Sequence, residues 1–415
     1  MPSSASSPQP AASCCIAGGG PAGMILGFLL ARAGVEVVVL EKHADFLRDF
    51  RGDTIHPSTL ELLYELGLLD RFLQRHHQEL PQVGVVIDDI SVTVADFRHL
   101  PVHCKFIALM PQWDFLNFIS ESAQVYPQFK LHMETEVTDL IIESDRVAGV
   151  RAKTPGGIRE FRAALTIGAD GRHSTVRKQA GFEVIDLGAP IDVLWMRISR
   201  QPSDPHQTLG RFRAGKLLVT LDRDDYWQCA YIIPKGGFPA IQQNGLPAFR
   251  AGIETVAPFL RGRTAELRDW SDIKLLSVAV DRVRHWSRAG LLCIGDSAHA
   301  MSPVGGVGIN LAIQDAVAAA NILAQPLLRH APIDAELHRV QERRTFPTRI
   351  TQGFQVFAHK RFIRPALATK APIKRLPFLL ALFKRFPILR RLPARMIGLG
   401  FRPEHIHTPN TNSGR

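Results

Sequence analysis

Apolar residues near the start of the chain occur in short runs separated by glycine. Residues 13–17 form a mostly apolar run, residues 18–23 are Gly-Gly-Gly-Pro-Ala-Gly, and an apolar stretch of helical length continues to Ala33. Residues 35–40 are rich in valine and are followed by Glu41. This order predicts a buried strand, a tight turn, a helix and a second buried strand.

Later parts of the chain show related patterns. Residues 166–168 end a strand-like run that leads into Asp170-Gly171. Residues 291–294 form an apolar run that leads into Gly295-Asp296, a turn rich in glycine and proline, and an apolar helix that starts near Gly308. Alternating apolar and polar positions in residues 191–199, 216–221 and 226–233 predict strands of a second sheet.

The turn at residues 18–23 has the G-x-G-x-x-G spacing of a phosphate-binding turn. Gly18 permits the tight turn, Gly20 lets the backbone approach a pyrophosphate, and Gly23 lets the helix pack on the strand. The helix N-terminus offers N–H donors and a partial positive charge to that pyrophosphate. Glu41 can accept hydrogen bonds from ribose hydroxyls. The motif predicts a dinucleotide site but does not by itself separate NAD from FAD.

The turn before the long apolar helix predicts a second binding element. Its glycines and proline within residues 303–308 let a flat, bulky group lie against the backbone. The start of the helix near Gly308 again offers N–H donors. Asp296, at the end of a strand, is placed to accept from a polyol hydroxyl.

Together these motifs resemble the three signatures of the single-component flavoprotein aromatic hydroxylases, which have the para-hydroxybenzoate hydroxylase fold. The resemblance covers residues 12–345 and implies a bound FAD. In the family, a glutamine matching Gln112 touches FAD, the backbone of a strand residue matching Val137 meets the adenine, and an arginine matching Arg51 lies beside the cofactor. The positions implied to bind FAD are Gly18, Gly20, Pro21, Ala22, Gly23, Glu41, Lys42, Arg51, Gln112, Val137, Asp170, Gly295, Asp296, Gly308, Ile309 and Asn310.

The chain departs from the family at one position in the last motif. Many relatives have a glutamine between the two glycines, where this chain has Val307. Backbone contacts are expected to survive this change, but any role of the glutamine side chain is lost. His299 resembles a catalytic base, yet its position in the motif favours a packing residue. No catalytic side chain is assigned.

The resemblance implies an α/β fold with a Rossmann-type FAD-binding domain, an inserted mixed β-sheet substrate domain and a helical C-terminal segment. The expected boundaries are a flexible leader at 1–12, FAD-binding segments at 13–180 and 288–345, a substrate-domain segment near 80–110, the substrate-binding sheet at 181–287 and the C-terminal segment at 346–415. Trp195, Arg197, Tyr226 and Gln228 are candidates for the substrate pocket, but alternation alone does not say which face each occupies.

The implied activity is that of an FAD-dependent monooxygenase. NAD(P)H binds transiently and reduces the flavin, O₂ gives a C4a-hydroperoxyflavin, and one oxygen is transferred to an aromatic or other unsaturated, lipophilic small molecule. The alternative on the same fold is a flavin-dependent reductase of a lipid or isoprenoid double bond. The Trp-x-Trp spacing typical of flavin halogenases is missing, which argues against halogenation. No metal is implied.

The net charge of +11 belongs to the end of the chain. Twelve Lys or Arg residues and no Asp or Glu lie between Lys360 and Arg402, which leaves 38 basic against 39 acidic residues elsewhere, a net of −1. The tail shows no recognised nucleic-acid-binding fold, so nucleic-acid binding is not expected. Five cysteines, an odd number without metal-ligand spacing, and the lack of a basic signal region predict a cytoplasmic protein.

The basic tail leaves two interpretations open. Prolines at 365, 372, 377, 387 and 393 break it into short pieces that interleave basic pairs with apolar clusters. These pieces either pack over the FAD-binding domain with their charges solvated, or bind peripherally to an anionic membrane at its inner face.

Overall fold

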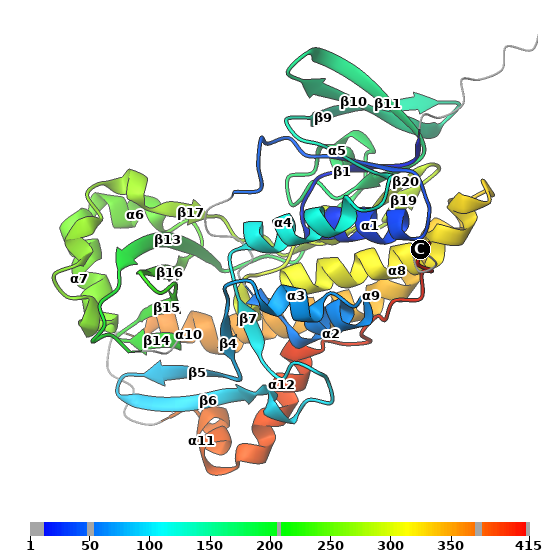
Figure 1. Cartoon of the computed structure of the whole chain (residues 1–415). Coiled ribbons are helices and arrows are strands. Elements are labelled where there is room, and N and C mark those ends of the chain that lie inside the picture. Colours follow the sequence, from blue (N-terminus) through cyan, green and yellow to red (C-terminus); the bar gives the residue numbers. More distant parts are fainter. Residues whose placement is uncertain (1–11, 48–53, 206–208, 370–375, 412–415) are drawn as a thin grey trace, which may run out of the picture.

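The computed structural model describes residues 12–47, 54–205, 209–369 and 376–411. Two β-sheets lie side by side in Figure 1, one at the upper right and one at the left. Arg51, which the sequence assigns to the cofactor, lies outside the described residues.

The first sheet contains a parallel core of five strands in the order β20-β11-β1-β2-β8. An antiparallel edge strand, β19, pairs with β20, and β10 pairs with β11 and β9 to form an antiparallel flap. Its strands are β1 (Ala12–Ala17), β2 (Val37–Leu40), β8 (Phe129–His132), β9 (Glu136–Glu143), β10 (Arg146–Thr154), β11 (Gly157–Gly168), β19 (Ser287–Arg288) and β20 (Leu291–Cys293). The α/β class predicted from the sequence is confirmed, since parallel neighbours need helical crossovers.

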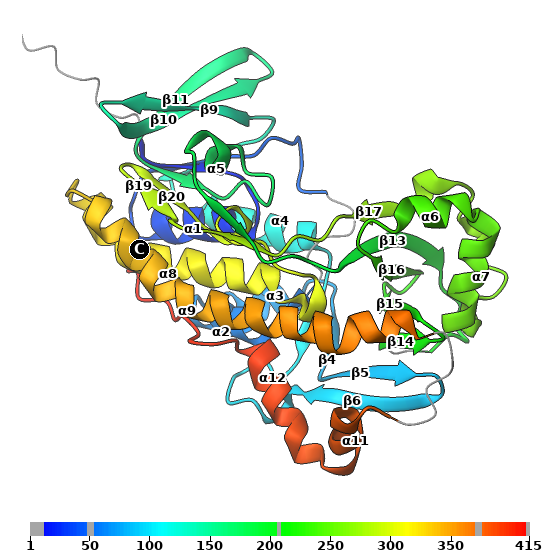
Figure 2. The same cartoon turned by 180° about the vertical axis from the view of Figure 1, so that it is seen from behind.

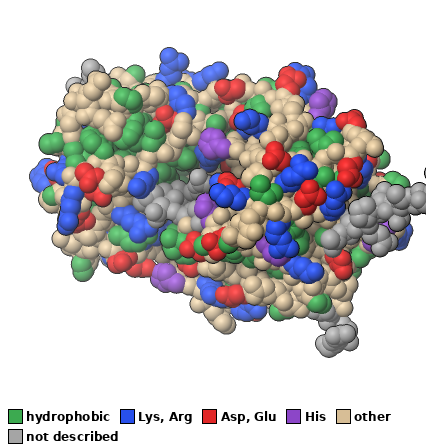
Figure 3. All heavy atoms as spheres, turned by 90° about the horizontal axis from the view of Figure 1, so that it is seen from above, with side chains coloured by type: hydrophobic (Ala, Val, Ile, Leu, Met, Phe, Trp, Pro, Cys, Tyr) green, Lys and Arg blue, Asp and Glu red, His purple; other side chains and the backbone are tan. Residues whose placement is uncertain are grey.

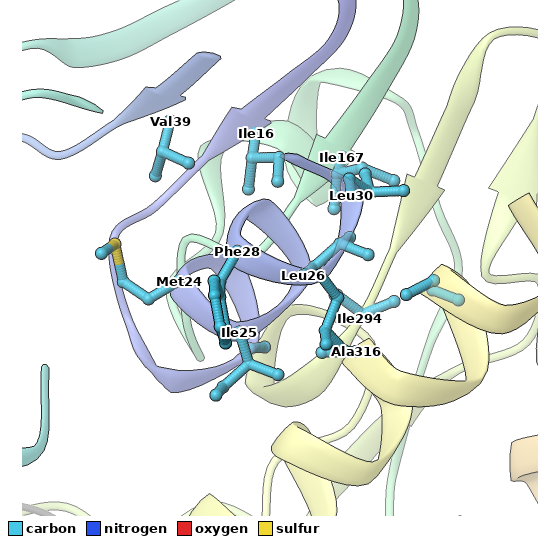
Figure 4. Close-up of a cluster of buried hydrophobic side chains, with 14 of the residues drawn as sticks. Ile16, Met24, Ile25, Leu26, Phe28, Leu30, Val39, Ile167, Ile294 and Ala316 are labelled. Atoms are coloured by element: carbon cyan, nitrogen blue, oxygen red, sulfur yellow. The ribbon is translucent and has the colours of Figure 1, made fainter. Parts of the chain in front are cut away.

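Two apolar helices, α1 (Pro21–Arg32) and α8 (Gly308–Leu328), pack against this sheet. Figure 4 shows Ile16 of β1, Leu26 of α1 and Ala316 of α8 in one buried cluster. α8 belongs to a stretch, Val304–Leu328, that is long and apolar enough to cross a membrane, but 72% of an apolar 18-residue part of it is buried inside the protein. Such burial is typical of a helix in the core of a globular domain.

The second sheet has seven strands in the order β17-β13-β16-β15-β14-β5-β6. One face is covered by α6 (Phe238–Gln243) and α7 (Leu246–Val256). A segment far upstream, β5 and β6, joins this sheet through a parallel pairing of β5 with β14. The strands are β5 (Gln82–Ile87), β6 (Ile90–Asp96), β13 (Ile191–Ser199), β14 (Leu209–Arg213), β15 (Lys216–Asp222), β16 (Tyr226–Pro234) and β17 (Lys274–Leu276).

Smaller elements connect the two sheets. A three-stranded sheet and a two-stranded one lie among the connections. Their strands are β3 (Thr54–Ile55), β4 (Gln78–Leu80), β7 (Ile107–Leu109), β12 (Val184–Asp186) and β18 (Asp281–Val283), and the helices are α2 (Pro57–Glu65), α3 (Leu69–Leu73), α4 (Gln112–Ala123) and α5 (Thr175–Gln179).

The C-terminal part is helical and then returns to the first sheet's helices. α9 (Asp334–Ala358) continues through a π-helical turn, His359–Ile363, into α10 (Arg364–Ala368), and α11 (Phe378–Arg385) and α12 (Arg391–Gly398) follow. Beyond α12 the chain runs back to α1, where the Thr411 N–H donates to the Arg32 carbonyl over 3.0 Å. The face seen in Figure 3 has acidic and basic side chains interspersed, without a large area of one sign.

Candidate functional site

The first glycine turn, residues 18–23, joins β1 to α1 and is held by contacts between its own backbone and its neighbours. Gly18 has φ of +107°, and a Cβ there would lie 2.4 Å from the Ala169 carbonyl oxygen. A Cβ on Gly23 would lie 2.0 Å from the Gly18 carbonyl oxygen. Both distances are shorter than any side chain tolerates, so glycine is required at Gly18, beside the segment that follows β11, and at Gly23, where α1 packs on the turn.

Gly20 is different, because it faces open space. A Cβ there would meet no atom within 4 Å, and φ is an ordinary −73°. Gly20 is the N-cap of α1 and Pro21 its first residue, and the first N–H groups of the helix have no partners inside the helix. A cradle of this kind fits a pyrophosphate, which needs close backbone approach and N–H donors.

Glu41 lies beside the first glycine turn, at the end of β2. Its carboxylate accepts from the Gly19 N–H over 2.9 Å and from the His43 N–H over 3.1 Å, and contacts His43 Nδ1 at 2.5 Å. The neighbouring Lys42 is exposed. The Thr135 N–H donates to the Glu41 carbonyl over 2.8 Å, so the segment that leads to Val137 in β9 lies next to Glu41. The structure thus brings these positions together at one end of the sheet.

Gly295 connects the first glycine turn to α8. It has φ of +60°, and a Cβ there would lie 3.2 Å from the Cβ of Ala22 in α1 and 3.1 Å from that of Ala312 in α8. The next residue, Asp296, is about a third exposed, and its Oδ2 lies 3.7 Å from Arg172 Nη2. The Asp296 carboxylate therefore remains near the surface, between the two glycine turns.

The second glycine turn, residues 303–308, is held by side chains that come from far upstream. Asn310 Oδ1 accepts from the His56 N–H over 2.9 Å and from Thr59 Oγ1 over 2.7 Å, while its Nδ2 donates to the Thr54 carbonyl over 3.1 Å. Thr54 Oγ1 in turn donates to the Gly306 carbonyl over 3.0 Å. The Asn310 side chain is thus occupied by protein groups, and it fixes the backbone of α8's first turn, including Gly308 and Ile309, against β3 and α2.

Asp170 has a structural task in this structure. Its Oδ1 accepts from Ser174 Oγ over 2.5 Å and its Oδ2 from the Val176 N–H over 3.1 Å, so it holds Ser174, the N-cap residue of α5, and an N–H of the helix's first turn. Burial raises the pKa of Asp170, although these hydrogen bonds act in the opposite direction. Gln112 is the first residue of α4 and is half-buried.

His299 is completely enclosed, with 1% of its surface exposed. Its Nε2 contacts Asp315 Oδ2 at 2.5 Å, and Arg344 Nε donates to Asp315 Oδ1 over 2.9 Å. Burial raises the pKa of Asp315, but His299 and Arg344 outweigh burial and leave it lowered. Arg344 also donates to Glu404 Oε1 over 3.2 Å, so the cluster holds the C-terminal segment beyond α12 in place. The packing interpretation of His299 agrees with this geometry.

The second sheet turns a mixed face toward the second glycine turn. Val304 packs against an apolar cluster that includes Ile191 and Ile232, and Trp195 packs against the same cluster. Arg197 pairs with Gln228 in the β13–β16 register and shares the face of Trp195, because side chains two apart on a strand point the same way. The sequence alone could not say on which face of the sheet Trp195 and Arg197 lie. The packing of Val304 against the apolar cluster shows that they lie on the face toward the second glycine turn.

Comparisons with known proteins agree with this architecture. Residues 11–353 match the family model described as an FAD binding domain. The 6-methylpretetramide 4-monooxygenase of Streptomyces rimosus is 34% identical over 349 residues, which cover 82% of each chain. An uncharacterized aromatic compound monooxygenase of Bacillus subtilis is 26% identical, over 76% of this chain and 62% of its own length.

A solved structure is similar in fold. PqsL, a probable FAD-dependent monooxygenase from Pseudomonas aeruginosa, matches with a TM-score of 0.72 at 20% identity, over 86% of this chain and 98% of its own. The two sequence relatives are named as monooxygenases and neither as a reductase, so the reductase alternative has no support. The chain therefore belongs to the FAD-dependent aromatic monooxygenases, enzymes for which FAD is the cofactor and NAD(P)H the usual reductant.

Proposed function

We propose that this enzyme hydroxylates an aromatic polyketide at the face of the second sheet that looks toward the second glycine turn. The observation that carries this proposal is the composition of that face: Trp195 and the apolar cluster around Val304 are continued by Arg197, Tyr226 and Gln228. The relative from Streptomyces rimosus, 34% identical, is named for a 4-monooxygenation of 6-methylpretetramide.

The polar residues of this face are held in defined positions. The Arg197 guanidinium carbon lies 4.9 Å from the centroid of the Tyr226 ring, a stacking distance. Gln228 is buried and accepts from Arg223 Nε over 3.2 Å. A fused-ring phenol fits such a wall, because its rings bury apolar surface while its hydroxyls meet a few fixed polar groups.

The two glycine turns would hold FAD between them. Bound FAD, once reduced, supplies the chemistry that activates O₂ and transfers one oxygen atom. The first turn would offer N–H donors around Gly20 to the pyrophosphate, and Glu41 would accept from a ribose hydroxyl beside it. Asp296, which is partly exposed, would accept from the ribityl chain. The N–H groups of Gly308 and Ile309, in the turn that Asn310 holds, would stabilise negative charge at the pyrimidine edge.

The purified holoenzyme tests this proposal directly. NAD(P)H oxidation is measured with monocyclic phenols and with fused-ring aromatic polyketides, and products are analysed under ¹⁸O₂. We expect stimulation by the fused-ring compounds and one ¹⁸O atom in the product. A flavin spectrum with oxidation stimulated only by monocyclic phenols would overturn the polyketide assignment. Product formation without O₂ would overturn the hydroxylase assignment.

We also propose that α11, α12 and the short 3₁₀ helix between them, Pro387–Arg390, touch the inner face of an anionic membrane, as one of the two interpretations of the tail suggests. Phe378, Ile388 and Leu392 expose 82%, 65% and 66% of their surfaces. Lys384 and Arg385 lie in the last turn of α11, between these apolar groups. Exposed apolar side chains next to cations suit the interface of an anionic bilayer, where each nearby cation contributes about 1 kcal/mol.

Vesicle flotation of the full chain tests the membrane contact. The triple variant Phe378→Ser, Ile388→Ser, Leu392→Ser is expected to lose binding to vesicles that contain anionic lipid. The matched control is Ile158→Ser, a 74% exposed apolar residue on the β11 edge of the flap, far along the chain from the tail. Equal flotation of wild type and the triple variant would contradict the proposal.

A further inference from the structure

α9 lies along the segment that leads into the second glycine turn. Figure 2 shows α9, in orange, running past α8 toward β14 and β15 of the second sheet. Gln355, on the buried side of α9, accepts from the Ser302 N–H over 3.1 Å. Its Nε2 donates to the Ser302 carbonyl over 2.9 Å and to the Val304 carbonyl over 3.1 Å. One side chain of α9 therefore fixes three backbone groups at the start of the turn.

His359 holds the side chain of the same serine. It begins the π-helical turn that follows α9, and it is completely buried. Its Nε2 lies 2.8 Å from Ser302 Oγ, which also accepts from the Val304 N–H over 3.3 Å. Burial lowers the pKa of His359, so near pH 7 the ring is neutral and can accept from the Ser302 hydroxyl. Gln355 and His359 together hold every polar atom of Ser302.

The π-helical turn also reaches the face of the second sheet. The Arg364 N–H donates to the His359 carbonyl, five residues back, which is the hydrogen bond of a π-helical turn. Ile363, the last residue of this turn, packs against the same apolar cluster as Val304 and Trp195. One short turn therefore contacts both the second glycine turn and the sheet. Single π-helical turns within α-helices occur frequently at functional sites.

His359 is an expensive residue for packing alone. Among the residues that the structure describes, its Nδ1 has no hydrogen-bond partner, and a buried polar atom without a partner lowers stability. An apolar side chain of similar size would fill the same space without this loss. The contact with Ser302 is what the imidazole adds, so the residue is better explained by the placing of the glycine turn.

We propose that His359 is a positioning residue for the hydroxylation, because through Ser302 it holds the start of the second glycine turn between FAD and the substrate face. This inference rests on the proposed position of FAD against that turn. The other end of the turn is held from β3 and α8, where Thr54 Oγ1 and Asn310 Nδ2 donate to the Gly306 carbonyl over 3.0 Å and 3.4 Å. The turn is thus fixed from two sides by segments far apart in the chain.

A shift at Ser302 would be carried into the rest of the turn, because the Gly306 N–H donates to the Pro303 carbonyl over 3.0 Å. The N–H groups of Gly308 and Ile309 would then lose their alignment and stabilise negative charge on reduced FAD less well. The distance between FAD and the substrate would also vary, so more of the O₂ consumed would leave as H₂O₂ and less would enter product.

Three variants of the FAD-loaded full chain test the role of His359. His359→Leu removes the contact and keeps an apolar side chain of similar size. His359→Gln keeps a polar group that can reach Ser302. Thr348→Val is the matched control, because Thr348 is equally buried on α9 and its hydroxyl has no hydrogen-bond partner among the described residues.

Two quantities are measured, the reduction potential of the bound flavin and the product formed per NAD(P)H oxidised. The second uses the fused-ring compound that stimulates oxidation most. In His359→Leu we expect a lower potential and about tenfold less product per NAD(P)H, with little change in KM, since small misplacements at a reacting centre cost up to about 100-fold. His359→Gln is expected to recover most of both, and Thr348→Val to leave both unchanged.

A folded His359→Leu protein with the wild-type potential would overturn the proposal, as would a His359→Gln protein that recovers nothing. If His359→Leu does not fold, Ser302→Ala removes the other half of the contact, and an unchanged potential there would overturn the proposal equally. Asn310→Ala separates this inference from the proposed position of FAD. If that position is wrong, neither Asn310→Ala nor His359→Leu affects the flavin, whereas an effect of Asn310→Ala alone would contradict only the role of His359.

Discussion

The two glycine turns serve one site but are stabilised in different ways. The first, around Gly18 and Gly23, is fixed by backbone atoms that lie too close for any Cβ. The second is fixed by hydrogen bonds from Asn310 and Thr54, residues more than 250 positions apart in the chain. Steric contacts with backbone atoms, of Ala169 at Gly18 and of Gly18 at Gly23, allow no adjustment, whereas hydrogen bonds can be lost one at a time. A substitution in the first turn should therefore cost much stability at once, whereas substitutions in the second turn should cost stability in smaller steps.

The largest effect is expected from Gly18→Ala. The new Cβ would lie 2.4 Å from the Ala169 carbonyl oxygen, at a φ of +107° that alanine rarely adopts. Overpacking and backbone strain together cost about 3 kcal/mol or more. Urea unfolding and the flavin content of the purified protein measure the result. A variant with wild-type stability and flavin content would show that the turn can rearrange.

Asn310→Ala is expected to cost less. It leaves the His56 N–H, the Thr59 hydroxyl and the Thr54 carbonyl without their buried partner. Unsatisfied buried groups of this kind cost about 2 kcal/mol. The folded protein should form but bind FAD more weakly, as measured by urea unfolding and by flavin titration. If Asn310→Ala lost as much stability as Gly18→Ala, the contrast between the turns would not hold.

Sequence reasoning succeeded where partners are close along the chain. The strand, turn, helix and strand that surround Gly18 and Glu41 lie within about thirty residues, so their spacing predicts this part of the fold. The partners of Asn310 could not be predicted, because they lie on β3 and α2, and no local pattern records that contact. Asp170 shows another limit: an acid after a strand is compatible with a ligand contact and with holding a helix N-terminus, and here it accepts from Ser174, the N-cap residue of α5, and from the Val176 N–H.

The same limit of sequence reasoning applies to the second sheet and to the C-terminal segment beyond α12. Alternation in residues 191–199 predicts two faces, but only the packing of Val304 shows which face Trp195 shares. The ion pair between Arg344 and Glu404 joins a helix to a segment without regular structure, so periodicity carries no information about it. These features depend on tertiary contacts rather than on local propensity.

His56 lies in the segment that Asn310 holds, and through it the stability of the fold should depend on pH. His56 is fully buried, its Nδ1 contacts the Ile397 carbonyl at 2.8 Å, and burial lowers its pKa to about 4. The unfolded chain, with a pKa near 6.5, then binds the proton more tightly than the folded one. Stability is therefore greatest above pH 6.5 and falls as the pH drops toward 4, with a slope approaching about 1.4 kcal/mol per unit.

Urea unfolding between pH 4 and 7 measures this slope in wild type and in His56→Gln, which keeps a donor for the Ile397 carbonyl but does not titrate. The difference between the two slopes isolates His56 from the carboxylates. Asp315, whose pKa is lowered, adds its own loss only at lower pH, below the ordinary range of an aspartate. Identical slopes in the two proteins would show that His56 does not titrate in this window.

The smallest effect on stability is expected from Gly20→Ala, which sharpens the comparison inside the first turn. The new methyl group would meet no protein atom within 4 Å, and φ of −73° suits alanine, so the unfolding free energy of the apoprotein should change by less than about 0.5 kcal/mol. The methyl group would instead occupy the space proposed for the pyrophosphate. FAD affinity should therefore fall by at least about tenfold, or about 1.4 kcal/mol, in a flavin titration. Unchanged FAD affinity in a stable Gly20→Ala protein would mean that the pyrophosphate does not lie against Gly20, and that the open space beside this residue does not serve FAD binding.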